Sequence, residues 1–270
     1  MAKTSHEDLV DIQFGARATA YLASAVHAQG EDLVALAHLA QGHPHARVLD
    51  LGCGGGHVSF RAAASVHEVV AYDLSADMLA VVSSAAQQRG IANITTQRGR
   101  VETLPFESKS FDIVLSRYSA HHWHDFAAGL KEAARVLKCG GTAGFVDVVS
   151  PGTALFDSFL QAIELMRDPS HVRDYSRAEW ETALAAAGLT CEATQRFRVR
   201  LDFEEWVERM KTPAVQVDAI RTLQRAVSSD VRDYFQVAED GSFSIDVALF
   251  STFKRNLETS SSKSNSNVPR

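Results

Sequence analysis

The sequence predicts an α/β fold with a parallel sheet, and three observations support this expectation. Short apolar strands alternate with helical segments between residues 46 and 149, which is the pattern of consecutive parallel βαβ units. The strands lack a strict alternation of apolar and polar residues, as expected for a sheet covered on both faces. A glycine-rich turn at residues 52–56 joins the first strand of the series to its first helix.

The elements of the first half follow in order. Two helices are expected before the series, at residues 6–28 and 31–39, and Gly42 and Pro44 end the second of them. The strands are predicted at residues 46–51, 68–74, 93–99, 111–118 and 142–149. The helices between them are predicted at residues 56–65, 75–89 and 125–138.

The pattern changes after Pro151. A helix is expected at residues 154–166, and Ser176 begins another, with Glu179 three residues later completing a capping box. A strand at residues 191–201, helices over residues 203–235 and a last strand at residues 242–253 follow. The chain therefore divides into residues 1–150, residues 151–256 and a polar, low-complexity tail, 257–270, that is expected to be disordered.

Composition excludes several classes of protein. The 270 residues are 46% hydrophobic and 22% charged, with a formal net charge of -6, which disfavours nucleic acid as the main partner. The N-terminus is too polar for a signal peptide, and no apolar run approaches the roughly 18 residues of a membrane span. The three cysteines are far apart in the sequence, as expected for reduced thiols. The sequence therefore favours a cytoplasmic protein.

The glycine-rich turn is the first candidate binding site. It reads "DLGCGGG", with Asp50 before Gly52, Gly54 and Gly56. A strand that enters such a turn and then a helix directs backbone N–H groups at one point, where a ligand can approach without meeting a Cβ. Asp73 ends the next strand about twenty residues later, the spacing of an acid that binds ribose hydroxyls. Turn geometry alone for the glycines, and a helix N-cap role for Asp73, are the alternatives.

The spacing of the three glycines, with Asp50 before them, resembles the S-adenosylmethionine (SAM) loop of class I methyltransferases. Downstream, "LPFESKSFDIVLSRYSAHHWHD" and "LKEAARVLKCGG" resemble the signature of the type 11 methyltransferase group, which includes the ubiquinone/menaquinone biosynthesis C-methyltransferase family. The resemblance extends over residues 14–149. It implies a Rossmann-like, seven-stranded sheet of order 3-2-1-4-5-7-6, in which only the seventh strand is antiparallel.

The resemblance also implies SAM as the cofactor and assigns roles to individual residues. Gly52, Gly54 and Gly56 would face its methionine part, Asp50 would fix the loop, and Asp73 would bind the ribose. The remaining implied contacts are Leu74 and Met78 near the adenine, the Val101 backbone and Glu102 beside it, Arg117 beneath the donor, and Tyr21 in a segment closing over it. Core packing is the alternative for Met78 and Tyr21. Arg100 stands where relatives carry an Asp that meets the adenine amino group, so that side-chain contact is not expected here.

Three histidines, His121, His122 and His124, follow the fourth strand of the series. Histidine titrates near pH 6.5 and is a common general base. His121 and His122 are therefore candidate catalytic bases for the acceptor, although a structural or donor-lining role and a metal site are alternatives; we expect no metal. Tyr118 is a candidate substrate contact or a packing residue.

A second polar cluster lies in "MRDPSHVRDY". Arg167, His171, Arg173 and Tyr175 are candidate substrate contacts, because loops after a strand often carry them. An internal network of ion pairs explains the cluster equally well. The helices between residues 204 and 235 are interpreted either as a lid over a small substrate or as the face of a homodimer.

The sequence therefore predicts a SAM-dependent methyltransferase that methylates carbon, nitrogen or oxygen of a small molecule by in-line displacement. An RNA or protein methyltransferase is an alternative, as is a SAM-binding regulatory protein without activity. An NAD-dependent oxidoreductase would need a longer glycine spacing and lacks the "LPF…SFD" block.

Overall fold

The structure is a computed structural model, and it describes residues 4–15 and 30–255. The expected donor contact Tyr21, most of the first predicted helix beyond Gly15, and the predicted disordered tail lie outside the described residues.

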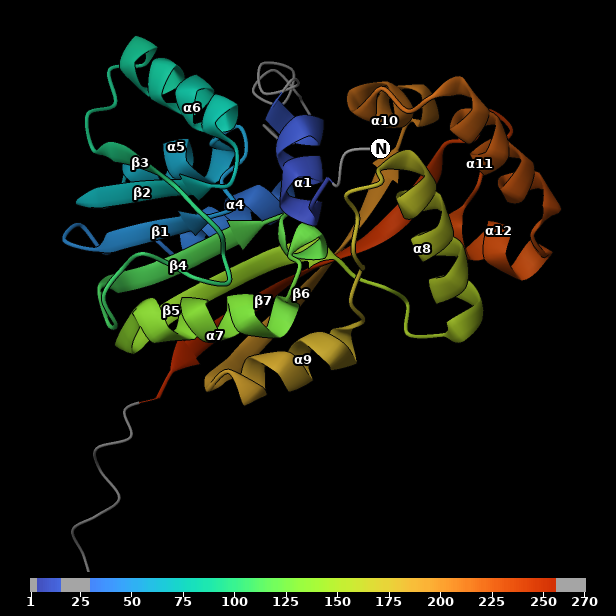
Figure 1. Ribbon diagram of the computed structural model, residues 1–270. Helices are drawn as coiled ribbons and strands as arrows, with labels where there is room; N and C mark the ends of the chain where they lie inside the picture. Colours follow the sequence, from blue (N-terminus) through green and yellow to red (C-terminus); the bar gives the residue numbers. More distant parts are fainter. Residues whose placement is uncertain (1–3, 16–29, 256–270) are drawn as a thin grey trace, which may run out of the picture.

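A seven-stranded sheet of order β3-β2-β1-β4-β5-β7-β6 forms the centre of the molecule (Figure 1). Every neighbouring pair is parallel except β5–β7 and β6–β7, which are antiparallel. The order and the single antiparallel strand are those implied by the resemblance. The strands are β1 Arg47–Leu51, β2 Glu68–Asp73, β3 Ile94–Arg98, β4 Phe111–Arg117, β5 Leu137–Val148, β6 Leu189–Leu201 and β7 Phe243–Lys254.

Helices cover both faces of the sheet (Figure 1). One face packs against α4 and α5 and, beyond them, α8 and α10–α12, while α7 and α9 cover the other. The helices before β6 are α1 His6–Gly15, α4 Glu31–His38, α5 His57–Ala63, α6 Ala76–Gln88, the 3-10 turn η1 Ala120–His122, α7 Phe126–Val136, α8 Ala154–Arg167 and α9 Arg177–Ala186. Between β6 and β7 lie α10 Phe203–Met210, α11 Ala214–Ala226 and α12 Ser229–Phe235.

The helix starts follow from the residues that precede them. Asp125 accepts a hydrogen bond from the Ala128 N–H at the start of α7, and Ser176 with Glu179 forms the predicted capping box of α9. Both side chains satisfy N–H groups that the first helical turn leaves without a partner.

One predicted boundary is wrong. The helix expected at residues 125–138 ends at Val136, and β5 already begins at Leu137 rather than at Thr142. Leu137 pairs with Phe111 of β4, and the register shifts before the next pairs are made. Pairing of this buried leucine with the sheet therefore prevails over the helical spacing that predicted a longer helix.

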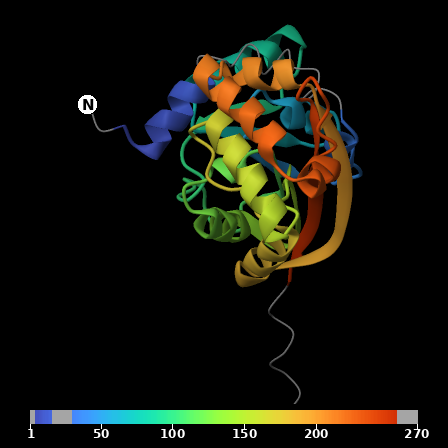
Figure 2. The same cartoon turned by 90° about the vertical axis from the view of Figure 1, so that its right-hand side faces the viewer.

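The elements after β5 extend the fold at one end of the sheet. Figure 2 shows α8 and α11 next to each other, with β6 and β7 to their right. Trp206 of α10, Ile220 of α11 and Phe235 of α12 are each at most 1% exposed and join the core of that face. The three helices are thus packed parts of the domain, which fixes the side chains they present to the sheet.

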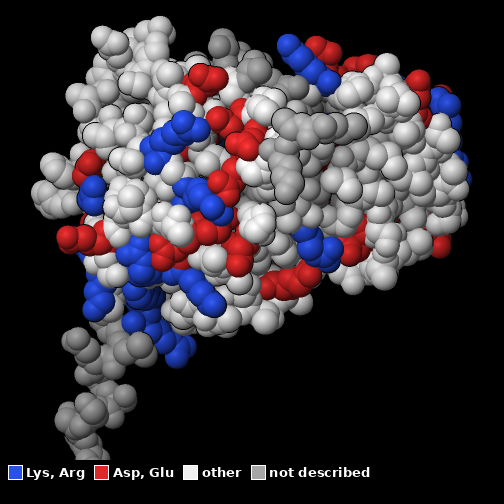
Figure 3. All heavy atoms as spheres, in the orientation of Figure 1, with Lys and Arg blue, Asp and Glu red and all other residues white. Residues whose placement is uncertain are grey.

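On the face seen in Figure 3, acidic and basic side chains are interleaved around α1, and Lys and Arg gather at the lower edge, below α7. Within residues 4–15 and 30–255, none of the helices has both the length and the apolar character needed to cross a membrane.

Candidate active site

A cavity lies at the carboxyl ends of β1, β2 and β4, where ligands of open α/β sheets bind. We call it the glycine-loop cavity, because Gly52 and Gly54 are in its wall. It encloses about 1050 Å³, part of it open to solvent. Its wall includes most of the residues predicted to contact the cofactor, namely Gly52, Gly54, Asp73, Leu74, Met78, Val101, Glu102 and Arg117.

The glycines are required by the shape of the loop. Gly52, Gly54 and Gly56 have φ angles of 72°, 48° and 80°, in the left-handed region that residues with a Cβ avoid. A Cβ on Gly52 would also collide with Ser119 Oγ. The loop therefore brings bare backbone to the cavity wall, followed directly by the first turn of α5.

The two predicted acids hold this loop from different sides. Asp73 lies in the wall and accepts hydrogen bonds from the N–H groups of Gly54, at 2.8 Å, and Ser75, at 2.9 Å. Asp50 lies behind the loop and accepts a 2.6 Å bond from Ser59 of α5. Burial raises the pKa of both carboxyls, that of Asp50 to about 7. Asp73 therefore serves as a loop anchor as well as a cavity residue.

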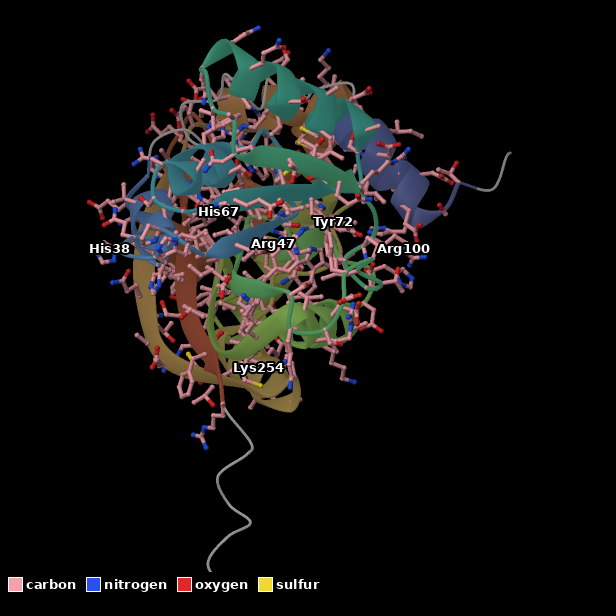
Figure 4. All side chains as sticks on the ribbon, turned by 90° about the vertical axis from the view of Figure 1, so that its left-hand side faces the viewer. His38, Arg47, His67, Tyr72, Arg100 and Lys254 are labelled. Carbon is pink, nitrogen blue, oxygen red and sulfur yellow. The ribbon has the colours of Figure 1, made fainter. Side chains whose placement is uncertain are left out.

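The far end of the glycine-loop cavity is formed by α1 and the segment after β3. Arg100 forms ion pairs with Glu7 of α1, at 2.8 Å, and with Glu102, at 3.7 Å. The Tyr72 hydroxyl donates a 2.9 Å bond to the Arg100 carbonyl, and Figure 4 shows both residues at this end of the sheet, opposite His67. The Arg100 side chain is thus directed to α1, while a buried tyrosine fixes its backbone.

Beneath the cavity, a buried ion pair joins β4 to α4. Arg117 Nε lies 2.6 Å from Asp32, and both side chains are at most 5% exposed. Burial raises the pKa of Tyr118, which also hydrogen bonds to Asp32. Tyr118 has a φ of 51°, and this costly backbone conformation turns the chain from β4 into η1.

A second cavity adjoins the first, and Phe14, Tyr118 and His122 lie in the walls of both. It encloses about 660 Å³, again partly open to solvent. The second cavity also contains His121 from η1 and Arg167 from the last turn of α8. His122 therefore lies between the two cavities, and His121 lines the second cavity alone.

His121 is held by a carboxylate at the end of β5. Its Nδ1 lies 2.5 Å from Asp147 Oδ1, and Asp147 Oδ2 accepts from the backbone N–H groups of Ala120 and His121. Burial alone would lower the pKa of His121, but the Asp147 charge outweighs it and raises the pKa to about 9. Nε2 has no hydrogen bond to a described residue, so it is the ring nitrogen left for a ligand in the second cavity.

His122 is in the opposite electrostatic situation. Burial, with the neighbouring charge of His121, lowers the pKa of His122 to about 4. Its Nδ1 lies 3.0 Å from the Ser170 carbonyl, and a carbonyl only accepts, so Nδ1 carries the proton. His122 is thus a neutral imidazole with its Nε2 lone pair free of a proton.

The predicted cluster after α8 separates into different environments. His171 is buried and lies 3.1 Å from Gln161, Arg173 forms ion pairs with Asp157 and Glu179, and Tyr175 stacks on Phe126. Unlike Tyr118 and Arg167, these three side chains lie outside the walls of both cavities. For Arg173, the geometry is that of the internal ion-pair network given as the alternative.

Several residues of the second cavity, and the Asp147 that holds His121, were not singled out from the sequence. Asp147 interrupts the apolar strand "TAGFVDVV", which is a signal, since a buried acid in a strand needs a partner. Glu164 lies on the buried face of α8, four residues after the buried Leu160. Asp174 and Trp206 carry no comparable signal. Within the described part of the chain, no group of three or more His, Cys, Asp or Glu side chains is arranged to hold a metal ion.

Comparisons with known proteins show the family to which the chain belongs. A family model described as a methyltransferase domain matches residues 49–145. The uncharacterized protein YafE of Escherichia coli is 48% identical over 75% of this chain and 98% of its own length. The uncharacterized methyltransferase YcgJ of Bacillus subtilis is 35% identical over 90% of this chain and 98% of its own.

The crystal structure of YcgJ has the same fold. It superposes with a TM-score of 0.80 at 34% identity, covering 83% of this chain and 98% of that one. A demethylmenaquinone methyltransferase of Lactococcus lactis is 34% identical over 44% of this chain and 47% of its own length. The chain therefore belongs to the methyltransferase family and is a SAM-dependent enzyme of the class I fold.

Proposed function

We propose that the enzyme binds SAM in the glycine-loop cavity and methylates a small molecule that occupies the second cavity. The observation that carries the proposal is the shared wall of Phe14, Tyr118 and His122 between the two spaces. A donor whose methionine part lies against the Gly52 loop has the second cavity as its neighbour. The helices α8 and α10 enclose that cavity, which supports a small acceptor over a macromolecule.

The chemistry asked of the protein is mainly alignment. The acceptor lone pair forms a bond to the methyl carbon while the carbon–sulfur bond breaks, and S-adenosylhomocysteine leaves with the electron pair on sulfur. Holding two reactants in line can supply about 7–11 kcal/mol of the barrier. Two adjoining cavities with a common wall provide this alignment without a covalent intermediate.

The proton of the acceptor passes to His121 in this proposal. Asp147 orients the ring through Nδ1 and stabilises the imidazolium that forms, so Nε2 can accept a proton from the nucleophile. The neutral His122 is a weaker base, because its pKa is about 4, and it accepts a hydrogen bond at the junction. Arg167 and Tyr118 contribute to the acceptor side.

Turnover can be tested without knowing the acceptor. The enzyme is incubated with a protein-free metabolite extract and with SAM that carries a tritiated methyl group. The tritium in new products is counted, and the S-adenosylhomocysteine formed is measured separately. Label that depends on both enzyme and extract is the expected result. Tight SAM binding by calorimetry with no labelled product from any extract would instead support a regulatory protein without activity.

A further inference from the structure

One wall of the second cavity is acidic. Glu164 at the end of α8, with Asp168 and Asp174 in the loop that follows, contributes three carboxyl groups to it. Their exposures are 7%, 2% and 1%. Burying carboxyl groups this completely is costly unless cations or hydrogen-bond donors compensate them, so their partners decide what the cavity can accept.

The cations of this wall are already engaged within the protein. Arg167 donates from Nε to the Trp206 carbonyl at 2.9 Å, and its Nη1 lies 3.4 Å from Glu164. His121 is paired with Asp147. Arg209, the remaining cation among the described lining residues, is partly exposed and has an interaction of its own. An anionic ligand would therefore meet more buried carboxyl groups than available cations.

Asp174 lacks a hydrogen-bond donor. Its Oδ2 is buried and has none among the described residues. The nearest candidate, His171 Nε2, is 3.9 Å away and lies 3.1 Å from Gln161 Oε1 instead. Gln161 donates from its amide nitrogen to Asp157 and to the Asp174 carbonyl, so its oxygen must accept, and His171 Nε2 must donate to it. A buried carboxyl left in this way calls for a donor from outside the protein.

Glu164 has one pairing partner among the described residues, Arg167. Its Oε2 faces Arg167, while Oε1 has no hydrogen bond to a described residue. Burial raises the pKa of Glu164, and it raises the pKa of Asp174 well above the usual range. Both shifts mean that burial favours the protonated, neutral form of these carboxyl groups, and a donor or cation placed opposite them would favour the ionised form.

The rest of the lining is apolar. Val148 of β5, Val199 and Leu201 of β6, Ile245 of β7 and the Trp206 ring of α10 form it. Such a surface binds a hydrophobic or aromatic body by excluding water. The second cavity therefore combines one apolar surface with one wall that accepts hydrogen bonds.

We infer that the methyl acceptor is a neutral or cationic small molecule with an apolar body, whose amine or hydroxyl group donates to Glu164 and Asp174, and which bears no carboxylate or phosphate. The inference rests on the proposed function and names the substrate class of its second cavity. The N–H or O–H supplies the donor that Asp174 lacks. A carboxylate or phosphate placed there would be buried beside these carboxyl groups, where the neighbouring Arg167 and His121 are already paired within the protein.

The first experiment separates acceptors by charge. A protein-free metabolite extract is passed over a strong anion-exchange resin, and the retained and unretained pools are each incubated with the enzyme and methyl-tritiated SAM. We expect about tenfold or more label in the unretained pool, because burying an anion without a compensating cation is strongly unfavourable. Mass spectrometry of the labelled product then distinguishes an N-methyl from an O-methyl group.

Two failures are distinguishable in that experiment. Label mainly in the retained, anionic pool would overturn the inference about acceptor class and leave the proposed methyl transfer standing. Absence of label in both pools, with SAM still bound, would overturn the proposed function itself, and the inference with it.

Neutral variants test the wall directly. Glu164→Gln and Asp174→Asn keep the shape of the side chains and remove their charge. We expect the rate of methyl transfer, measured with the unretained pool at a low and limiting concentration, to fall about tenfold through the loss of a hydrogen bond to a charged group. The melting temperature should stay the same or rise, because carboxyl groups held without partners for function reduce stability.

Asp157→Asn is the matched control. Asp157 lies on the same helix but pairs with Arg173, Ser150 and Gln161 outside the cavity, so this variant should lower the melting temperature and leave the rate at limiting acceptor unchanged. If Glu164→Gln and Asp174→Asn behave like this control, their carboxyl groups are structural and the inference is wrong.

Discussion

The glycine-loop cavity and the second cavity share three residues but have different chemistry. The first presents backbone from a loop at positive φ, with Asp73 bonded to two N–H groups. The second presents ionisable side chains whose pKa values are moved in opposite directions, upward at His121 and downward at His122. The contrast supports the proposal that one cavity holds SAM and the other holds the methyl acceptor.

The largest effect is expected when His121, the proposed base of the second cavity, is removed. His121→Ala should lower kcat by about 10²- to 10⁴-fold, the range for loss of a general base. SAM affinity by calorimetry should stay within twofold, taken as roughly the limit of an energetically silent change. His67→Ala, at the opposite end of the sheet, is the control; equal activity of the two variants would remove His121 from the mechanism.

The second largest effect is expected in the dependence of kcat/KM on pH. Only the neutral imidazole of His121 can accept a proton, so kcat/KM should rise by about tenfold per pH unit below the pKa of about 9 and then level off. The ion pair with Asp147 should stabilise the fold fully below the unfolded value near 6.5 and lose its effect as the pH rises through about 9. In Asp147→Asn, the plateau of kcat/KM should begin at a lower pH, because the charge that raises the pKa of His121 is gone. A plateau that begins at the same pH as in the unmodified enzyme would contradict the pairing.

Gly52→Ala tests the backbone character of the glycine-loop cavity. We expect a loss of about 1–3 kcal/mol in the free energy of unfolding, from positive φ and the clash with Ser119, together with weaker SAM binding. Gly90 also has a positive φ, but nothing lies within 4 Å of a Cβ added there. Gly90→Ala should therefore lose stability and keep its affinity for SAM. Denaturant unfolding and calorimetry on both variants check this, and unchanged SAM binding in Gly52→Ala would contradict it.

Asp73→Ala should weaken SAM binding by about tenfold, the value of one hydrogen bond to a charged group. Calorimetry measures the affinity, and the exposed Asp77→Ala serves as a control for charge at the same end of α6. If the two variants bind SAM with equal affinity, Asp73 does not contact SAM and only holds the loop.

The smallest effect is expected at Arg100. Its side chain pairs with Glu7 in a half-exposed ion pair, and such pairs contribute about 0–1 kcal/mol. Arg100→Ala should therefore change SAM affinity by less than about fivefold. A larger loss by calorimetry would mean that the side chain, and not only the backbone fixed by Tyr72, contacts the donor.

The first cavity could be predicted from the sequence because its parts are local. The glycines, Asp50 and Asp73 lie within 24 residues of one another, and strand ends in a parallel sheet meet at one edge whatever the remaining fold. The sheet order needed the resemblance, because periodicity indicates only that strands and helices alternate. The end of α7 was missed because β-pairing of Leu137 is a tertiary interaction.

The second cavity could be predicted only in part. His121 and Arg167 were singled out by type, but their partners Asp147 and Glu164 lie in an apolar strand and an amphipathic helix, whose patterns predict structure rather than contacts. Arg173 and Tyr175 looked the same in the sequence as Arg167. Packing alone decides that one faces a cavity while the others face Glu179 and Phe126.

The segment of α10–α12 leaves the sheet at Leu201 and returns at Phe243, and these two residues are paired with each other across β6 and β7. An insertion whose two ends are neighbours can change in length or sequence without altering the strands that hold it. It supplies Trp206 and Arg209 to the second cavity and nothing described to the glycine loop. The architecture thus offers an exchangeable module, through which a lineage or a designer could give the enzyme a new acceptor while the SAM site stays the same.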